Sequence, residues 1–231
     1  MKEPLLVFDM DGVLVDVTES YRETIARTVA RFTGVEITRA QIQDYKNRGG
    51  FNDDWELTHH IIREVGVDAP FEGVRECFQR VFLGNGGDGL ILRERWVARP
   101  GALEKLSERF RFAIFTGRPR EEADITLNRF AGSLVFDPVV GMYDVEKRKP
   151  HPEGLLRILN DNRDSSGQAC PAFYIGDSVD DARCAREAGV PFIGIAAPAN
   201  PAYLDLVFLF QAEKAYAIVD DINYLEEVFA S

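Results

Sequence analysis

The chain has 231 residues, of which 45% are hydrophobic and 28% charged, so it can bury a large core and is neither disordered nor collagen-like. Asp and Glu outnumber Lys and Arg by 38 to 27, and the net charge of −11 argues against binding to nucleic acid phosphates. The three cysteines lack the spacing of a zinc site, no signal-peptide pattern is present, and no apolar run is long enough to span a bilayer. We therefore expect a soluble, cytoplasmic protein with no nucleic-acid or membrane partner.

The first predicted element is a buried strand at residues 5–9. Four consecutive apolar residues, LLVF, are typical of a strand that is covered on both faces. They lead directly into Asp9 and Asp11, and Gly12 follows the second acid. Taken alone, the two aspartates fit a turn or a helix N-cap better than a catalytic pair. Their role therefore depends on which residues the rest of the chain places beside them.

Residues 17–92 carry helical patterns and no convincing buried strand. The helical patterns lie at residues 19–32, 37–47, 53–65 and 71–82, and a glycine cluster follows at 84–89. We therefore predict an all-helical domain over residues 17–92. It is inserted after the first strand into a core domain made of residues 1–16 and 93–231.

In the remainder of the chain, short apolar runs alternate with helical segments. The apolar runs lie at residues 111–116, 171–177, 191–197 and 215–220. The helical patterns between them lie at residues 101–110, 119–130, 152–160 and 179–189. This alternation is typical of βαβ units, so we predict a Rossmann-like α/β core of three layers, with helices on both faces of a parallel sheet.

Several of the predicted strands end in a polar residue. Asp9 and Asp11 follow the first strand, Thr116 follows FAIF, and Asp177 follows FYIG. Because ligands bind at the carboxyl ends of strands in open parallel sheets, we expect these side chains to meet in one crevice. Carboxylates gathered there repel one another unless a hard cation joins them, and Mg²⁺ prefers oxygen ligands. The sequence therefore predicts a Mg²⁺ site at this edge.

Four motifs, in this order, resemble those of the haloacid dehalogenase superfamily. They are DMDGV at 9–13, FTGRP at 115–119, KRKPHPE at 147–153 and GDSVDD at 176–181, and the resemblance runs from residue 5 to about 220. Each motif alone is consistent with a cap, a turn or a charged surface, but four in order are specific. The resemblance is to subfamily I, which has a helical C1-type cap and includes phosphoglycolate phosphatases and β-phosphoglucomutases.

The resemblance implies a Mg²⁺-dependent phosphatase that hydrolyses a small phosphorylated metabolite through an aspartyl-phosphate. It makes Asp9 the nucleophile and Asp11 the general acid and base. It also makes Thr116 and Gly117 donors to phosphoryl oxygens, with Lys149 as a fixed positive charge. The metal ligands that it implies are Asp9, Asp11 through its backbone carbonyl, and Asp177, with Asp181 acting indirectly.

Substrate recognition is predicted to involve Arg118, Arg48, Asn52 and Trp55. Arg118 follows the Thr-Gly turn and fits either an anionic substrate group or a surface ion pair. The other three flank a glycine pair in the helical insert, which fits a loop facing the substrate or a helix–helix turn with Trp55 packed inside. Both possibilities stay open, as do the roles of His59, His60 and His151.

Two other functions are compatible with the same motifs. A phosphomutase of the β-phosphoglucomutase type would return the phosphoryl group to a second hydroxyl. A non-catalytic protein would bind a phosphate ligand on the same fold, although the complete motif set argues against it. Neither the metabolite nor the choice between a monomer and a homodimer follows from the sequence.

Overall fold

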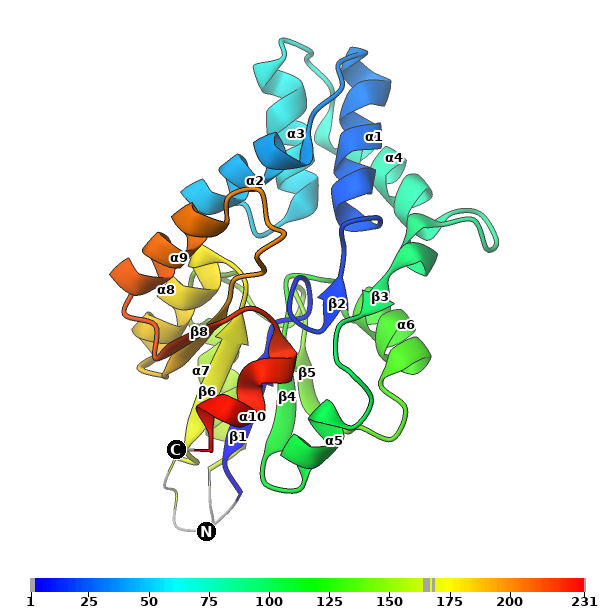
Figure 1. Cartoon of the computed structure of the whole chain (residues 1–231). Coiled ribbons are helices and arrows are strands. Elements are labelled where there is room, and N and C mark those ends of the chain that lie inside the picture. The colour runs from blue at the N-terminus through cyan, green and yellow to red at the C-terminus, as the bar shows by residue number, and fades with distance from the viewer. Residues whose placement is uncertain (1–2, 164–166, 168, 231) are drawn as a thin grey trace. The chain divides into compact units, whose positions relative to one another are not determined.

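The computed structural model describes residues 3–230 except 164–166 and 168. The chain divides into two compact units, one formed by residues 1–15 and 96–231 and the other by residues 16–95 (Figure 1). In the described part of the chain, none of the helices has the length and apolar character needed to cross a membrane.

The larger unit, called the core unit, is built on a six-stranded parallel sheet. Its strands are β1 (Leu5–Phe8), β4 (Arg111–Phe115), β5 (Phe136–Val140), β6 (Ala172–Gly176), β7 (Phe192–Ile195) and β8 (Ala217–Val219). They run in the order β5-β4-β1-β6-β7-β8, so β1 lies in the interior of the sheet. Phe8 at the end of β1 pairs with Ile114 and Ile175 on its two neighbours. This register brings the three loops that follow these strands to the same edge.

Helices cover both faces of this sheet (Figure 1). They are α5 (Ala102–Ser107), α6 (Arg120–Phe130), α7 (Glu153–Asp161), α8 (Val179–Ala188), α9 (Tyr203–Ala212) and α10 (Leu225–Val228), with the 3-10 helix η2 (Ile222–Tyr224). Leu5 and Val7 belong to one apolar cluster with residues of α7, α8 and α9. Phe8, the next residue of β1, instead packs edge-on against the ring of Phe112 at a centroid distance of 5.3 Å. Alternate residues of β1 thus serve two cores, and the predicted three-layer α/β fold is confirmed.

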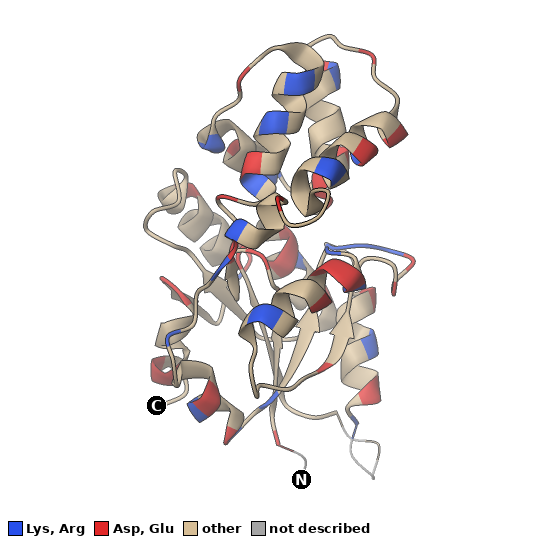
Figure 2. Ribbon diagram, turned by 90° about the vertical axis from the view of Figure 1, so that its right-hand side faces the viewer, with Lys and Arg blue, Asp and Glu red and all other residues tan. Residues whose placement is uncertain are grey.

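Charge is distributed between strands and helices as a buried parallel sheet requires. Figure 2 shows Lys, Arg, Asp and Glu mainly on helices and loops, whereas the strand sequences LLVF, AFYIG and FIGI contain no charged residue. Strands covered on both faces must be apolar throughout, which is why five of them were recognisable as short apolar runs.

Besides the short helices η2 and α10, two elements of the core unit were not predicted. The edge strand β5 contains Pro138, which weakens a strand pattern but is tolerated at the edge of a sheet. Helix α9 is apolar around most of its surface, and Leu204 and Phe208 are 76% and 70% exposed. Its sequence is an apolar run without the polar face that marks an amphipathic helix, and for this reason it was not predicted as a helix.

The smaller unit, called the cap unit, is helical. Its helices are α1 (Tyr21–Thr33), α2 (Arg39–Arg48), α3 (Asp54–Glu64) and α4 (Phe71–Leu83), followed by the 3-10 helix η1 (Leu90–Arg93). A two-stranded sheet of β2 (Val15–Asp16) and β3 (Arg95–Trp96) forms where the chain passes between the two units. Thr38 starts α2 with a capping box, and Asp53 caps α3. The helical insert is therefore present, and short-range hydrogen bonds set the starts of α2 and α3.

Candidate active site

The loop after β1 places Asp9 and Asp11 at the carboxyl edge of the sheet. The amide of Asp9 continues the strand ladder by donating to Ile175 O at 2.8 Å, and Asp9 is 5% exposed. The chain then turns back, and the Gly12 N–H donates to Val15 O at 2.8 Å. Gly12 has a φ of 73°, in the left-handed region that other residues rarely adopt. A glycine turn therefore holds both acids at the end of a buried strand.

Lys149 is the centre of a buried polar cluster. Its ammonium lies 2.9 Å from Asp9 Oδ1 and 2.8 Å from Asp181 Oδ1. It also donates to the Tyr174 hydroxyl at 2.9 Å and to Phe115 O at 3.2 Å. The side chain of Lys149 is 1% exposed and that of Asp181 is 0% exposed. The fold thus joins the first, third and fourth motifs through one buried cation.

Burial and pairing shift the pKa values of this cluster in different directions. Burial raises the pKa of Asp9 well above its usual value, and Lys149 only partly opposes that rise. Burial acts to lower the pKa of Lys149, but Asp181 and Asp9 together outweigh it and raise that pKa. At Asp181, burial is outweighed by Lys149, which lowers the pKa of the carboxyl. Lys149 and Asp181 therefore stabilise each other's charged forms, whereas burial disfavours the ionised form of Asp9.

Three carboxylates of the core unit lie close enough together to share a metal ion. Asp9, Asp177 and Asp181 each offer an oxygen within 4.8 Å of the other two. Gly12 makes room for them, because a Cβ at this position would lie 1.9 Å from Asp177 Oδ2. A set of carboxylate oxygens suits Mg²⁺. Burial raises the pKa of Asp9 and the neighbouring carboxylates add to this rise, and a cation between them would counter both effects. The donor set therefore fits the metal expected from the sequence.

Thr116 stands at the end of β4 with its hydroxyl oriented by the next turn. Its N–H donates to Val140 O at 3.0 Å, and the residue is 1% exposed. Its Oγ1 accepts a hydrogen bond from the Arg118 N–H at 3.2 Å. Because the oxygen acts there as an acceptor, its proton stays available for donation elsewhere. Gly117, between these two residues, is half-buried.

Arg118 forms an ion pair in the structure, but a buried one. The residue is 1% exposed, and its Nε donates to Asp11 Oδ1 at 2.7 Å. Its Nη1 donates to Thr126 Oγ1 on α6 at 3.0 Å. The surface ion pair considered from the sequence is therefore not formed, and a contact of Arg118 with substrate stays a prediction.

The three cap residues predicted to meet the substrate lie in different surroundings. Arg48 is exposed, with its guanidinium 4.8 Å from the centre of the Tyr45 ring. Asn52 is half-buried in the loop before α3. Trp55 is 7% exposed, and the Arg75 guanidinium lies 5.6 Å from its ring centre. Of the two possibilities for Trp55, its burial favours packing inside the cap unit, and a substrate role for the three residues stays a prediction.

Each histidine has a local partner. His59 lies 3.0 Å from a backbone carbonyl oxygen, and His60 pairs with Glu64 at 3.2 Å. His151 accepts a hydrogen bond from the amide of Glu153 at 3.3 Å. These contacts favour structural roles, and none of the three belongs to the carboxylate cluster of the described residues.

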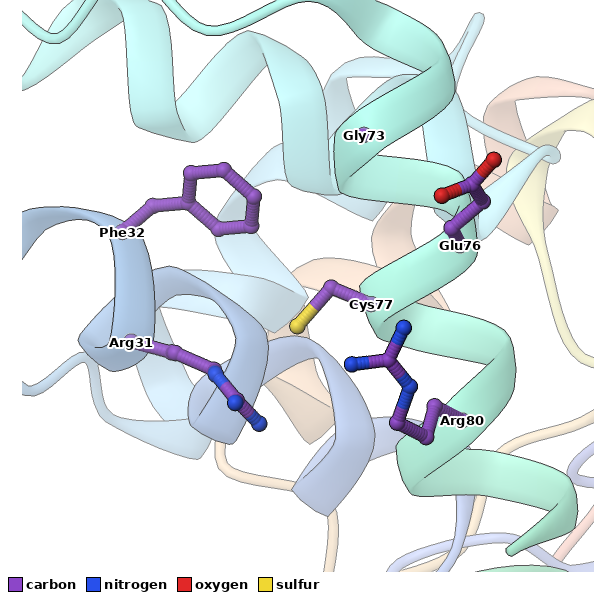
Figure 3. A pocket seen from close by; sticks show the side chains of 6 residues that line it. All are labelled: Arg31, Phe32, Gly73, Glu76, Cys77 and Arg80. Atoms are coloured by element: carbon purple, nitrogen blue, oxygen red, sulfur yellow. The ribbon is translucent and has the colours of Figure 1, made fainter.

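The cap unit contains a cavity of about 310 Å³ between α1 and α4 (Figure 3). It is lined by Arg31, Phe32, Gly73, Glu76, Cys77 and Arg80. Figure 3 shows the Phe32 ring and the Cys77 sulfur pointing into the space between the two helices. The cavity contains a single carboxylate and none of the predicted site residues, so it offers no second acid cluster.

Tyr174 and Ser178 belong to the buried cluster but were not predicted. The Tyr174 hydroxyl donates to Asp181 Oδ1 at 2.8 Å. Ser178 Oγ donates to Asp181 Oδ2 at 2.6 Å and caps α8. A tyrosine within an apolar strand was the available signal, because a buried hydroxyl needs a partner. Ser178 and Asp181 have the spacing of a capping box.

Comparison with known proteins gives the same fold and a family. The model of the haloacid dehalogenase-like hydrolases matches residues 4–189. A HAD-superfamily hydrolase of subfamily IA, variant 1, from Geobacter sulfurreducens has a TM-score of 0.63 at 22% identity. That structural match covers 99% of this chain and 97% of the other, and at this identity it speaks for the fold.

Two curated relatives differ in how much of their length is matched. An imidazoleglycerol-phosphate dehydratase of Phytophthora nicotianae is 34% identical over 200 residues, which is 84% of this chain but 43% of that protein. A phosphoglycolate phosphatase of Rhodobacter capsulatus is 28% identical over 200 residues, 82% of this chain and 83% of that protein. The chain thus spans less than half of the first relative and most of the second.

Proposed function

The chain belongs to the haloacid dehalogenase-like hydrolases, and we propose that it is a Mg²⁺-dependent phosphatase of a small phosphorylated metabolite. The observation that carries the proposal is the buried contact of 2.9 Å between Lys149 and Asp9, beside the carboxylate of Asp177. These groups come from three separated segments and suit attack on an anionic ester. The acidic chain supplies no comparable reason to propose a nucleic-acid partner.

The proposed nucleophile is Asp9. Its carboxylate attacks phosphorus, an Asp–phosphate bond forms, and the ester P–O bond breaks. Bringing a carboxylate to about 4 Å from a phosphate costs about 4 kcal/mol per pair of unit charges at an effective dielectric constant near 20. Lys149 offsets part of this repulsion from its position beside Asp9. Mg²⁺ held by Asp9, Asp177 and the backbone carbonyl of Asp11 would supply further charge neutralisation and orient the phosphoryl group.

The proposed proton carrier is Asp11. It gives a proton to the leaving oxygen as the ester bond breaks, and then takes one from the water that attacks the aspartyl-phosphate. The second step releases inorganic phosphate and restores the Asp9 carboxylate. The Thr116 hydroxyl and the Gly117 amide donate to phosphoryl oxygens throughout. Asp181 keeps Lys149 charged, and its indirect role toward the metal is part of the same proposal.

The names of the relatives suggest the first substrates to test. Phosphoglycolate carries a carboxylate, and imidazoleglycerol phosphate carries an imidazole ring, so the two differ strongly in charge and shape. Arg48, Asn52 and Trp55 are the cap residues that we propose for this selection. An Arg48→Ala variant should then change the ranking of substrates more than the rate with a generic aryl phosphate.

The test is phosphate release by the full chain from p-nitrophenyl phosphate and from the two named substrates. Asp9→Asn keeps the shape of the side chain but removes the nucleophile, so it should lower the rate by about three orders of magnitude or more. Asp205→Asn is the control: it makes the same substitution at an exposed position of α9 and should leave the rate unchanged. EDTA should stop the reaction and added Mg²⁺ should restore it.

Different failures identify different alternatives. Equal rates for Asp9→Asn and the unaltered protein would contradict the covalent route. Indifference to EDTA would remove the metal from the proposal. A phosphomutase would require a bisphosphate activator and release no net phosphate, and a binding protein would turn over none of the esters.

A further inference from the structure

Arg118 is a buried arginine in contact with the proposed proton carrier. Its side chain is 1% exposed, whereas that of Asp11 is 28% exposed. A guanidinium that has lost its hydration must be compensated by fixed partners, and its geometry is correspondingly constrained. Arg118 is therefore a rigid element of the core unit and not a mobile surface charge.

Its contacts with Asp11 involve one oxygen of the carboxylate. Nε donates to Oδ1 at 2.7 Å, and Nη2 forms an ion pair with the same atom. The opposite end of the guanidinium is held by Thr126, because Nη1 donates to its Oγ1 at 3.0 Å. Among the described residues, no hydrogen bond to Oδ2 of Asp11 is found. Arg118 thus holds Asp11 through Oδ1 and not through Oδ2.

The backbone of Arg118 takes part in the same arrangement. Its N–H donates to Thr116 Oγ1 at 3.2 Å, and its carbonyl accepts from the Met142 N–H at 2.9 Å. Gly141 leaves room for this carbonyl, since a Cβ there would lie 2.8 Å from it. One residue therefore orients both the carboxylate of Asp11 and the hydroxyl proposed to bind phosphate.

We propose that Arg118 is a positioning residue that fixes Asp11 through Oδ1 and leaves Oδ2 as the oxygen that meets the leaving group. This inference rests on the proposed function, because it concerns the step in which the ester oxygen departs. It differs from a substrate contact, since Arg118 acts through Asp11 and is itself buried. Without the anchor, Asp11 spends less time in the reactive orientation.

A series of aryl phosphates tests this role in the full chain. Phenyl phosphate has a poor leaving group that needs a proton, whereas p-nitrophenyl phosphate has a good one that needs little help. The quantity to compare is kcat/KM, which covers the steps up to leaving-group departure and is independent of the later hydrolysis. Arg118→Met should lower kcat/KM by roughly 100-fold for phenyl phosphate and by less than about 5-fold for p-nitrophenyl phosphate.

Four further variants make the result specific. Arg118→Lys offers a single ammonium in place of the forked guanidinium. Its loss of kcat/KM with phenyl phosphate should therefore be intermediate between that of Arg118→Met and the unaltered protein. Asp11→Asn should show the steep dependence on the leaving group, and adding Arg118→Met to it should change that dependence little. Arg120→Met removes an exposed arginine two residues away, whose Nη1 donates to Val139 O, and should keep the dependence of the unaltered protein.

The outcomes separate this inference from the proposed function. The positioning role is overturned if Arg118→Met lowers kcat/KM equally for all the aryl phosphates, or lowers it for none of them. If that variant does not fold, an unaltered dependence in Arg118→Lys overturns it equally, as does an unaltered dependence in Asp11→Asn. Absence of turnover in the unaltered protein, or full turnover in Asp9→Asn, instead overturns the proposed function itself.

Discussion

Replacing Lys149 by Met removes the buried cation but retains most of the volume of its side chain. The ammonium lies 2.9 Å from Asp9 Oδ1 and 2.8 Å from Asp181 Oδ1, and the lysine side chain is 1% exposed. Loss of the ammonium leaves the buried carboxylates of Asp9 and Asp181 without the positive charge that they share. Removing one partner of such a buried pair typically costs about 3–5 kcal/mol of the free energy of unfolding. We expect a loss of that size at neutral pH when no metal is added.

The expected loss depends on pH in a definite direction. Without Lys149, burial and mutual repulsion raise the pKa of Asp9 further, and Lys149 no longer lowers that of Asp181. A folded-state pKa above the unfolded value means that the folded protein binds the proton more tightly. The stability of the variant is therefore retained below the unfolded pKa and lost as the pH rises through the folded pKa. The difference in the free energy of unfolding between the variant and the unaltered protein should accordingly become smaller as the pH falls from about 7.5 to about 5.5.

Urea denaturation in EDTA, followed by circular dichroism at several pH values, measures this difference. Lys147→Met is the matched control, because Lys147 is an exposed lysine two residues away in the same loop. It should change the free energy of unfolding by less than about 0.5 kcal/mol at every pH. A loss below about 1 kcal/mol in Lys149→Met, or one that is the same at all pH values, would refute the electrostatic reasoning.

Two further predictions concern the metal site and a buried thiol. Gly12→Ala places a Cβ 1.9 Å from Asp177 Oδ2, so it should raise the Mg²⁺ concentration for half-maximal activity by about 10-fold or more. Gly34→Ala is the control, because Gly34 has a similar φ of 71° with nothing within 4 Å of the added carbon; an equal Mg²⁺ response in both variants would contradict the explanation. Burial raises the pKa of Cys184 to about 12, so iodoacetamide should label Cys184 in urea but not in the native protein at about pH 8, as peptide mass spectrometry can show. Rapid native labelling of Cys184 would show that this thiol is accessible.

Local sequence signals were sufficient for much of the architecture. The strands β1, β4, β6, β7 and β8 were visible as apolar runs because a strand covered on both faces has few polar positions. The helices of the insert were visible from their helical sequence patterns, and two of them, α2 and α3, begin at side-chain caps such as the capping box at Thr38. Edge strand β5 and helix α9 were missed because the first contains a proline and the second lacks a polar face.

Some features of the candidate site were likewise predicted from the sequence, and others were not. Asp9, Asp11, Thr116 and Asp177 were predicted to meet because parallel strands deliver their carboxyl ends to one edge. Lys149 follows no predicted strand, and only the resemblance of its motif to that of a known family placed it in the site. The burial of Arg118 against Asp11 had no local signal, since arginine in a turn is more often exposed. The tyrosine in strand β6 indicated a buried hydroxyl that needs a partner, but no local pattern indicated that Lys149 and Asp181 are its partners.

By itself, the sequence determined most of the segments that form strands and helices and the residue types that follow the recognised strands, because both depend on neighbours in the chain. Only the tertiary structure decided which charge pairs with which. Lys149 pairs with Asp9, 140 positions earlier, and Arg118 pairs with Asp11, 107 positions earlier. Such pairs form because a buried charge must find an opposite charge nearby in space, and no short stretch of sequence specifies which distant residue supplies it.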